Sequence, residues 1–380
     1  MSSLKSWAYL SRAFEGPSRE VNRALEAGFD ADEIARGIKT GASWAKELVK
    51  EAASRHMLDR AQQDLEIAHN EGARLISPED EEWPSECLDT AFGFAATGVS
   101  EHVRTYQSDA VAPHALWVKG DSLATLTRQA VAIVGTRAAT QYGQRATEAL
   151  VTGLVSRHYT IISGGALGID AIAHRAALDS GGPTIAVSAC GIDRTYPKVN
   201  APLFARATVV TEYPPETTPH RHRFLTRNRL VAALSQGTVV VEAAFRSGAL
   251  NTLSWAEGLG RVAMAVPGPI TSGSSVGCHM RIRNGQAQLV ASADDVRALV
   301  EPLGSVDPDA QLELDFAATP VQRLSRNELR VYDALSPHQQ VTTEEVARTA
   351  GLSVGLSVSL LMELESRGLV RRDGTTWGRS

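Results

Sequence analysis

Short apolar runs alternate with helical patterns through the middle of the chain. The runs are rich in β-branched residues, and segments such as 144–157 and 169–179 lie between them with apolar residues at helical spacing. Near-continuous apolar strands that alternate with helices are typical of a mostly parallel sheet with helices on both faces. The pattern therefore predicts an α/β fold with a doubly wound sheet, whose strands lie at 131–134, 160–162, 184–187, 208–211, 238–241 and 262–266.

The two ends of the chain have different patterns. Residues 1–75 contain apolar residues at helical spacing and few β-branched runs, which predicts a helical module like a SAM or helix-hairpin-helix domain. The turn-rich passage 77–113 then leads into the central domain, 76–305. Residues 306–320 hold acidic residues with little periodicity and predict an acidic linker. Residues 321–380 show three helical patterns and then a hairpin-like tail with Asp373 and Gly374 at its tip, which resembles a winged helix.

Composition and charge limit the functions that the chain can have. The 380 residues carry a formal net charge of −5, so binding to nucleic acid would require a local basic patch. Cys87, Cys190 and Cys278 are far apart in the sequence and form no CxxC pair, which predicts a reducing compartment and no metal site. No apolar run is long enough to span a membrane, and the first residues lack a signal-peptide pattern. We therefore expect a cytoplasmic protein that is not membrane-bound.

A glycine-rich turn between a strand and a helix is the first candidate site. In 161–178, IISGGALGIDAIAHRAAL, glycines at 164, 165 and 168 let the backbone approach an anion, and the helix that follows offers free N–H groups. No Lys-Ser or Lys-Thr pair follows the glycines, which argues against hydrolysis of a nucleoside triphosphate. We expect Asp170 and His174, four residues apart on this helix, to support the turn structurally.

A second turn carries an arginine. The segment 135–143, GTRAATQYG, follows the first central strand and has Arg137 where a dinucleotide fingerprint would have glycine. An arginine at a helix start adds a forked donor to the backbone N–H groups, which suits a phosphodiester. An ordinary strand-to-helix turn with a solvated arginine fits the same residues.

A basic patch follows at 219–229, PHRHRFLTRNR. It holds four arginines and two histidines, and no Asp or Glu lies between Glu216 and Glu242. Arginines beside Phe224 and Asn228 offer charge for a backbone and flat surfaces for bases, as single-stranded nucleic acid requires, although a solvated loop is the simpler interpretation. Tyr196, Lys198, Asn200 and Phe204 extend this mixed character.

Glu242 ends the apolar run 238–241 and is the best candidate for a buried carboxylate. It fits either a catalytic acid or base, or a fixed partner for an arginine of the basic patch. No second carboxylate stands at a suitable spacing, and no Ser-His-Asp or Cys-His arrangement is present. We therefore expect neither catalysis nor a cofactor.

Taken together, these motifs resemble the DNA-processing protein A family, also called DprA or Smf. The resemblance covers about 113–290 and rests on AIVGTR at 132–137, ISGGALGIDAIAH at 162–174, CGIDRTYP at 190–197, FLTRNRLVAALS at 224–235, VVVEAAFRSGALNT at 239–252 and AVPGP at 265–269. It implies an extended Rossmann-like domain that binds single-stranded DNA without catalysis. It further implies a homodimer that protects incoming DNA during natural transformation and loads the RecA recombinase onto it.

By motif match, the resemblance also implies which residues form the DNA site. Those expected to contact DNA are Gly135, Thr136, Arg137, Thr140, Ser163, Gly164, Gly165, Tyr196, Lys198, Asn200, Phe204, Arg227, Asn228 and Arg229. Those expected to support the site are Gly168, Asp170, His174 and Glu242.

The chain departs from the family pattern at three places. The glycine turn reads SGGA where SGLA is commoner, and Ser-Ala precedes Cys190-Gly191 in place of a more usual apolar residue. At 278–283, CHMRIR replaces a Gly-Ser-Asn-Leu-Ile pattern, which puts the dimer surface in question more than the DNA pocket.

Two other functions fit parts of the sequence. A nucleotide N-glycosidase of the phosphoribohydrolase type would use Gly248 to Thr252 together with Glu257, although the Pro-Gly-Gly start of that motif is missing. Alternatively, duplex DNA would bind the tail, with 353–367 as a recognition helix and Arg371 and Arg372 on the wing. That helix has few basic residues, so a role in protein contacts or packing fits it better.

Overall fold

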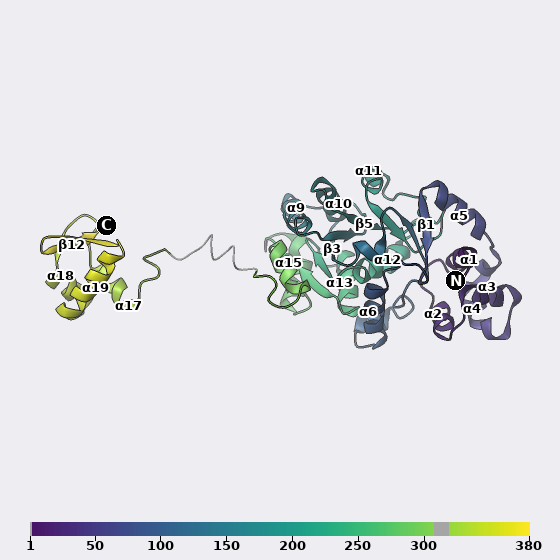
Figure 1. The fold of residues 1–380 in the computed structure, drawn as a ribbon, viewed down its shortest axis with the longest axis horizontal. Coiled ribbons are helices and arrows are strands. Elements are labelled where there is room, and N and C mark those ends of the chain that lie inside the picture. The colour runs from purple at the N-terminus through teal and green to yellow at the C-terminus, as the bar shows by residue number, and fades with distance from the viewer. Residues whose placement is uncertain (1, 308–318) are drawn as a thin grey trace. The chain divides into compact units, whose positions relative to one another are not determined.

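The computed structural model describes residues 2–307 and 319–380. The chain divides after Asp307 into two compact units (Figure 1). Most of the predicted acidic linker, residues 308–318, lies outside the described residues.

A nine-stranded sheet forms the centre of the larger unit, as described for residues 2–307. The strand order is β1-β2-β6-β5-β4-β3-β7-β8-β9. The strands from β3 to β9 run parallel, whereas β1 and β2 extend the sheet beyond β6 as antiparallel strands. Their bounds are Ala73–Ile76 (β1), Leu116–Lys119 (β2), Ala130–Val134 (β3), Thr160–Ser163 (β4), Thr184–Val187 (β5), Thr208–Thr211 (β6), Gly237–Val240 (β7), Val262–Ala265 (β8) and Gln288–Leu289 (β9).

The six strands predicted from the sequence are β3 to β8, and none of their ends is displaced by more than one residue. The strands β1, β2 and β9 were not predicted. β9 has only two residues, too few for a pattern, and β1 lies almost wholly inside the segment expected to be purely helical.

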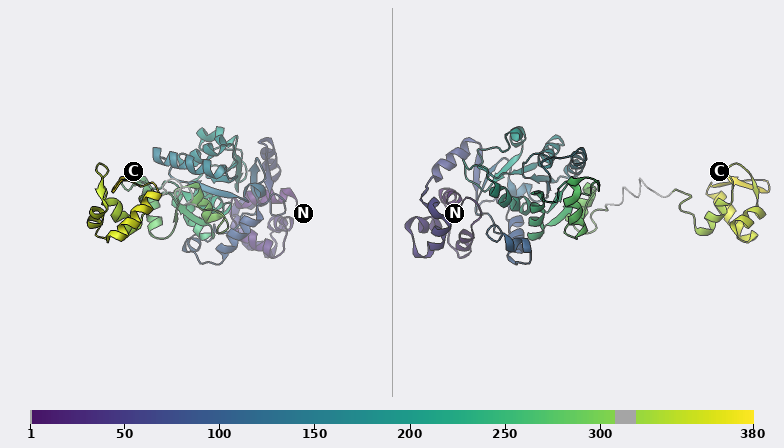
Figure 2. Two further views of the ribbon diagram at one scale, coloured as in Figure 1. Left: turned by 60° about the vertical axis from the view of Figure 1, so that its left-hand side comes forward. Right: turned by 180° about the vertical axis from the view of Figure 1, so that it is seen from behind.

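Helices cover both faces of the sheet (Figure 2). One face packs against α9 (Gln141–Val155), α10 (Ile169–Asp179) and α15 (Ala293–Val300). The other packs against α6 (Ser85–Ala96), α12 (Arg221–Ala233) and α13 (Ala249–Gly258). Shorter helices complete the layers: α7 (Glu101–Thr105), α8 (Leu123–Leu126), α11 (Ala201–Phe204) and α14 (Val276–Arg283). The passage 77–113, expected to be rich in turns, therefore contains two helices, α6 and α7.

The chain order reverses between β3 and β7. After β3 the chain builds β4, β5 and β6 on one side, and it then returns to place β7 on the other side of β3. In doubly wound sheets, ligands bind outside the carboxyl ends of the strands at such a reversal. The turns that begin at Gly135, after β3, and at Val241, after β7, flank that position.

The N-terminal helices pack on the sheet and belong to the same compact unit. These helices are α1 (Leu4–Phe14), α2 (Arg19–Glu26), α3 (Ala31–Thr40), α4 (Lys46–Ala52) and α5 (Ala61–Asn70). Leu10 and Phe14 of α1 share a core with Trp117 and Val209 of the sheet, and the indole N–H of Trp117 donates to the Ser11 hydroxyl at 2.9 Å. The apolar faces of these helices are therefore completed by β2 and β6, while the division at residue 75 stays a prediction.

The smaller unit has its own core, described for residues 319–380. It consists of α17 (Arg326–Asp333), β10 (Val341–Thr342), α18 (Thr343–Ala350), α19 (Val354–Ser366), β11 (Val370–Asp373) and β12 (Thr376–Arg379). Its strand order is β10-β12-β11, and Val331, Leu361 and Trp377 lie in the core. This element order agrees with the pattern expected from the sequence, while the winged-helix class itself stays a prediction. None of the described helices in either unit is long and apolar enough to cross a membrane.

Truncation distinguishes the two ends of the chain. We expect that deleting 308–380 leaves the unfolding temperature of the larger unit unchanged, because the two units have separate cores. Deleting 2–72 uncovers Trp117 and Val209, so the cooperative transition should be lost. Differential scanning calorimetry of both truncated proteins measures this. If the protein that lacks 2–72 unfolds cooperatively at the parent temperature, the N-terminal helices are a separate module.

Candidate functional site

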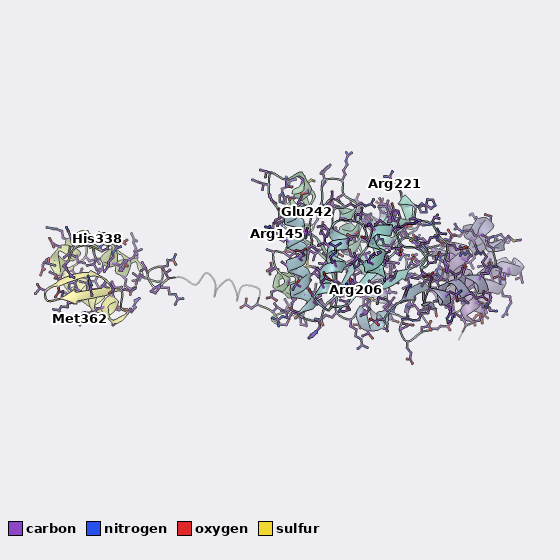
Figure 3. All side chains as sticks on the ribbon, turned by 90° about the horizontal axis from the view of Figure 1, so that it is seen from above. Arg145, Arg206, Arg221, Glu242, His338 and Met362 are labelled. Carbon is purple, nitrogen blue, oxygen red and sulfur yellow. The ribbon has the colours of Figure 1, made fainter. Side chains whose placement is uncertain are left out.

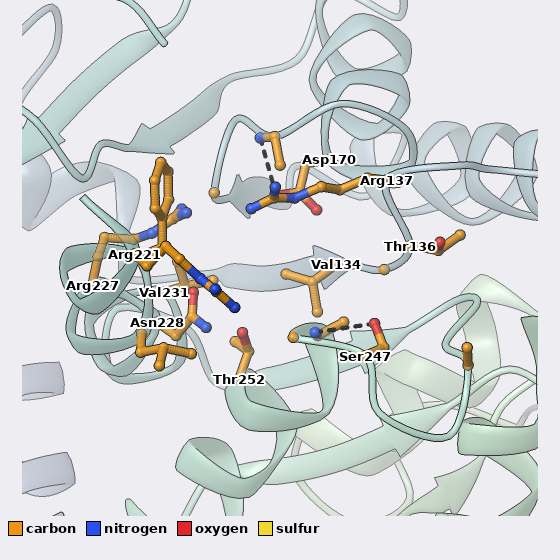
Figure 4. A pocket seen from close by; sticks show the side chains of 18 of the residues that line it. Val134, Thr136, Arg137, Asp170, Arg221, Arg227, Asn228, Val231, Ser247 and Thr252 are labelled. Carbon is orange, nitrogen blue, oxygen red and sulfur yellow. Dashed lines mark hydrogen bonds between the residues drawn. The ribbon is translucent and has the colours of Figure 1, made fainter. Parts of the chain in front are cut away.

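A cavity of about 670 Å³ lies at the reversal of the sheet (Figure 4). Its walls come from the segments after β3, β4, β5 and β7, from one side of α12 and from the start of α13. Small-molecule sites in proteins enclose roughly 300–1,000 Å³, so this space is large enough for a nucleotide.

The turn after β3 holds Arg137 at this cavity. The Thr136 N–H donates to the Glu242 carbonyl oxygen at 2.8 Å, and the Thr136 carbonyl accepts the Ile169 N–H at 3.1 Å. A Cβ on Gly168 would lie 2.3 Å from the Thr136 carbonyl oxygen, so the two turns approach this closely only because residue 168 is glycine. The Arg137 side chain is exposed, and it forms no ion pair within the described residues.

The buried carboxylate of Glu242 holds this turn through hydrogen bonds to Thr140. Its Oε2 accepts the Thr140 N–H at 3.0 Å, and its Oε1 accepts the hydroxyls of Thr140 at 2.7 Å and Ser274 at 2.9 Å. Glu242 is 1% exposed, and a Cβ on Gly143 would lie 2.0 Å from its Oε2. The carboxylate is thus a fixed hydrogen-bond partner of α9 and not a base open to a substrate. Thr140, whose hydroxyl also accepts the Gly143 N–H at 3.1 Å, caps α9 and has no free hydrogen to offer DNA.

The glycine turn after β4 is shaped by what packs against it. A Cβ on Gly164 would lie 2.0 Å from Nη1 of Arg227, and one on Gly165 would lie 2.5 Å from the ring of Phe204. Asn200 is buried and donates through Nδ2 to the carbonyls of Gly165, at 3.0 Å, and Ala166, at 3.2 Å. Asn200 and Phe204 therefore support the turn from below and are not positioned as contacts to a ligand.

Ser163 and His174 are also buried beneath the turns, and Asp170, which is 6% exposed, lines the cavity. Ser163 donates its hydroxyl hydrogen to the Ile133 carbonyl at 2.6 Å. Burial raises the pKa of Asp170, the positive charge of Arg227 opposes that rise, and Asp170 accepts the Ala166 N–H at 3.3 Å. The supporting role expected for Asp170 is consistent with these contacts.

His174 is held in one tautomer. Thr184 donates its only hydroxyl hydrogen to the Ile161 carbonyl at 2.8 Å, so the 2.7 Å contact between Thr184 Oγ1 and His174 Nδ1 requires a hydrogen on Nδ1. Burial, followed by the charge of Arg227, lowers the pKa of His174 to about 4. The ring is therefore neutral at pH 7. It is also packed away from the cavity: its Nε2 has no contact with solvent and no hydrogen-bond partner among the described residues.

The basic patch predicted from the sequence divides into two groups on α12. Arg223 donates to Glu15 at 2.8 Å, and Nη2 of Arg229 donates to both carboxylate oxygens of Glu212 at 2.6 Å. Arg229 is 0% exposed, so the prediction that it contacts DNA is wrong. Its positive charge compensates the negative charge of Glu212. Burial raises the pKa of Glu212, and the charge of Arg229 opposes that rise. Arg221, by contrast, is exposed and lies toward the outer edge of the larger unit (Figure 3).

Arg227 differs both from the paired arginines and from the exposed Arg221, because it is buried and yet lines the cavity. It is 4% exposed, its Nη1 donates to the Val187 carbonyl at 2.8 Å, and its Nε has no partner in the part of the chain that the structure describes. Burial lowers the pKa of this guanidinium, and Asp170 opposes the change. An anion in the cavity would offset the cost of burying this charge.

Two aromatic rings and two guanidinium groups form one wall of the cavity. The centroids of Tyr196 and Phe224 are 5.6 Å apart, and the guanidinium carbons of Arg137 and Arg227 lie 5.7 and 5.9 Å from the centroid of Phe224. Tyr196 is 48% exposed, so it presents a flat apolar surface to solvent beside cationic groups. This combination fits stacked bases and a phosphate backbone.

The DNA contacts predicted from the sequence did not include the loop after β7. Arg246, Ser247 and Gly248 line the cavity from this loop, and the Ser247 hydroxyl accepts the N–H of Ala249, the first residue of α13, at 3.3 Å. The loop lies opposite the Arg137 turn, and Arg246 is exposed. The reversal of strand order beside β3 was the available signal, because it brings the loop after β7 to the ligand position.

The predicted contact residues divide as follows. Those that line the cavity are Gly135, Thr136, Arg137, Gly164, Tyr196, Arg227 and Asn228. Gly165 lies in the glycine turn, and Lys198 is exposed but outside the cavity lining. Supporting positions are taken by Thr140, Ser163, Asn200, Phe204 and Arg229.

The features of the alternative N-glycosidase site are not brought together. Gly248 and Thr252 line the cavity, whereas Glu257 is exposed and lines a different cavity with His102 and Arg281. Within residues 2–307 and 319–380, no group of three His, Cys, Asp or Glu residues could hold a metal ion.

Comparison with known proteins identifies relatives over most of the chain. A family model described as DNA recombination-mediator protein A matches residues 74–301. The putative DNA processing protein DprA of Mycobacterium tuberculosis is 43% identical over 380 residues, which cover 97% of this chain and 93% of that protein. The X-ray structure of DNA processing protein A from Streptococcus pneumoniae aligns with a TM-score of 0.63 and 30% identity, over 79% of this chain and 99% of that one.

The fold and the site define a Rossmann-like protein with an arginine-lined cavity at the reversal of its sheet. The comparisons narrow this class: the chain belongs to the DNA recombination-mediator protein A family, whose curated members are named DprA or Smf. The resemblance inferred from the motifs is confirmed. The protein is therefore a member of a DNA-processing family.

The revised role of Arg229 can be tested by stability. Arg229→Ala leaves Glu212 buried without its partner, which should destabilise the larger unit by about 3–5 kcal/mol. Urea unfolding followed by circular dichroism measures the difference. The double variant Arg229→Met with Glu212→Leu removes both charges and should recover much of that loss. A fully stable Arg229→Ala protein with weakened DNA binding would restore Arg229 as a contact.

Proposed function

We propose that this protein binds single-stranded DNA in the cavity at the reversal of its sheet. The observation that carries the proposal is the set of exposed arginines around an aromatic wall, namely Arg137, Arg221 and Arg246, none of which forms an ion pair within the described residues. Guanidinium groups bind phosphates through charge and paired N–H donors. The glycine turn after β4, which leads into α10 without a side-chain cap, adds backbone N–H groups to the same space.

The aromatic wall favours a single strand over a duplex. In a duplex the base faces are covered by their neighbours, whereas a single strand can place a base against Tyr196 or on the guanidinium plane of Arg137. Recognition by stacking and charge tolerates any sequence, because every base has a flat face. Binding without strong sequence preference is the expected consequence.

The proposed role is binding without catalysis. Glu242 is engaged by α9, His174 is neutral and packed, and Asp170 is 6% exposed. Glu242 and His174 lack the access that a general acid or base requires. Asp170 reaches the cavity, but no other Asp, Glu or His is among the residues that line it. The protein would thus hold DNA and pass it on unchanged.

In the cell, we propose that the protein protects DNA taken up during natural transformation and delivers it to the RecA recombinase as a homodimer. The description of the matching family as a recombination mediator supports this assignment. The relatives named DNA processing protein DprA support the connection to DNA handling.

Removing one cavity arginine should weaken binding and its dependence on salt. For Arg137→Ala and for Arg221→Ala we expect about a tenfold loss of affinity for an oligothymidine, because each variant lacks one charge-assisted hydrogen-bond donor. The slope of log K against log salt should fall by about 0.7 for each phosphate that the variant no longer binds. Fluorescence anisotropy at several salt concentrations measures both quantities.

Arg128→Ala is the matched control. Arg128 is exposed and lies just before β3, at the amino ends of the parallel strands, whereas the cavity lies at their carboxyl ends. This variant removes the same charge and should leave affinity and slope near those of the parent. If Arg137→Ala and Arg221→Ala bind as tightly as Arg128→Ala at every salt concentration, the cavity is not the DNA site.

A further inference from the structure

The first turn of α12, which begins at Arg221, forms part of the cavity wall and lacks the usual stabilisation of a helix start. Its N-cap residue, His220, makes no side-chain cap hydrogen bond, and no acidic residue stands in the first turn. Helix starts are stabilised by a capping side chain and by negative charge, because their N–H groups are unpaired and their dipole is positive there. Arg221, Phe224 and Leu225 nevertheless line the cavity from this turn.

The missing negative charge comes from the N-terminal helices. Glu15 follows the last residue of α1 and adopts a left-handed conformation, with φ 50°, while its N–H donates to the Ser11 carbonyl at 3.0 Å. Its Oε2 accepts Nη2 of Arg223, in the first turn of α12, at 2.8 Å. The two side chains are 17% and 12% exposed, so water screens this pair less than a surface pair.

Arg223 is held at several other points in addition to Glu15. Its Nη1 donates to the Thr218 carbonyl, and its guanidinium carbon lies 5.4 Å from the centroid of the Tyr213 ring. The Tyr213 hydroxyl in turn donates to the Arg223 carbonyl at 3.4 Å. The backbone at residues 218–223 is thus tied to the side chain that Glu15 holds.

Glu15 is itself anchored to the rest of the larger unit. Arg55 lies 3.7 Å from its Oε2, and the guanidinium of Arg55 donates to the carbonyls of Ala13 and Phe14 at the end of α1. The helix α1 is in turn fixed to β2 through Ser11 and Trp117. A rigid path therefore runs from the sheet through α1 and Glu15 to the first turn of α12.

We propose that Glu15 is a positioning residue for the DNA site, and that the N-terminal helices serve to hold the cavity side of α12 in place. The inference rests on the proposed binding of single-stranded DNA. It assigns a binding role to a residue that carries the wrong charge to touch DNA. Glu15 acts through Arg223, which orients Arg221 and Phe224.

The sign of one substitution separates positioning from simple electrostatics. Glu15→Gln removes a negative charge near the DNA path, so electrostatics alone predicts tighter binding. Positioning predicts weaker binding, by about fivefold, because a partly buried ion pair at a helix start is removed. Fluorescence anisotropy with an oligothymidine, on the full-length protein, measures the change.

Glu20→Gln provides the matched control for charge. Glu20 lines the same cavity as Glu15, His222 and Thr226, but its carboxylate pairs with Arg23 on its own helix, at 2.6 Å. It undergoes the same change of charge without a contact to α12. Binding by Glu20→Gln should equal or slightly exceed that of the parent, and Glu15→Gln should fall below both.

Two further measurements distinguish a local change in α12 from a general loss of folding as the cause of weaker DNA binding. Hydrogen–deuterium exchange of Glu15→Gln should rise in the peptide 219–227 and stay unchanged in the strands. In a double-mutant cycle, adding Glu15→Gln to Arg223→Gln should weaken binding no further, since both substitutions remove the same ion pair.

Each outcome decides the inference. Equal or tighter binding by Glu15→Gln relative to Glu20→Gln, or unchanged exchange at 219–227, would overturn it. If Glu15→Gln unfolds, Glu15→Asp keeps the charge and shortens the reach, and parent-like affinity in that variant would likewise overturn it. Failure of the parent protein to bind any single-stranded oligonucleotide would instead refute the proposed function.

Discussion

The hydrogen bonds to Glu242 are the constraint on which the site depends. Two turns from different strands must meet at the reversal of the sheet, and each carries unpaired N–H groups that need a partner when buried. The Glu242 carbonyl takes the Thr136 N–H, and its carboxylate takes the Thr140 N–H and hydroxyl. One residue thus fixes both the turn that carries Arg137 and the start of α9. The glycines at 143 and 168 leave room for this arrangement, because a Cβ at either position would overlap an oxygen atom.

The arginines of α12 show how a protein with net negative charge can present a cationic cavity. Arg223 and Arg229 are used inside the larger unit, paired with Glu15 and Glu212. Among the arginines of this helix only Arg221 remains exposed, and Arg137 and Arg246 join it from other elements. A count of basic residues along the sequence therefore overstates the charge available to a ligand. What matters is which guanidinium groups have no carboxylate within reach.

The sequence predicted the parallel core of the sheet closely, because six buried strands leave continuous apolar runs that are hard to mistake. It missed β1 and β2, since strands that are added antiparallel at one end of the sheet do not follow the alternation of strand and helix. The turns at Arg137 and Gly164 were predicted correctly, because glycine and arginine at fixed places after a strand have a direct physical meaning. Arg229 was assigned wrongly, because its buried partner, Glu212, lies outside α12 and is brought beside it only by the fold. Arg246 was overlooked because only the strand order reveals which loop faces the first turn.

The close approach of Gly164 and Arg227 has a consequence for how this family can change over time. A side chain at 164 would occupy the place of the Arg227 guanidinium, and a shorter residue at 227 would leave a gap beneath the glycine. Neither position can be replaced well while the other stays as it is. The pair should therefore be inherited together, and relatives that lose the arginine would be free to lose the glycine as well. Such joint replacement would mark the branches in which the floor of the cavity has been given a different use.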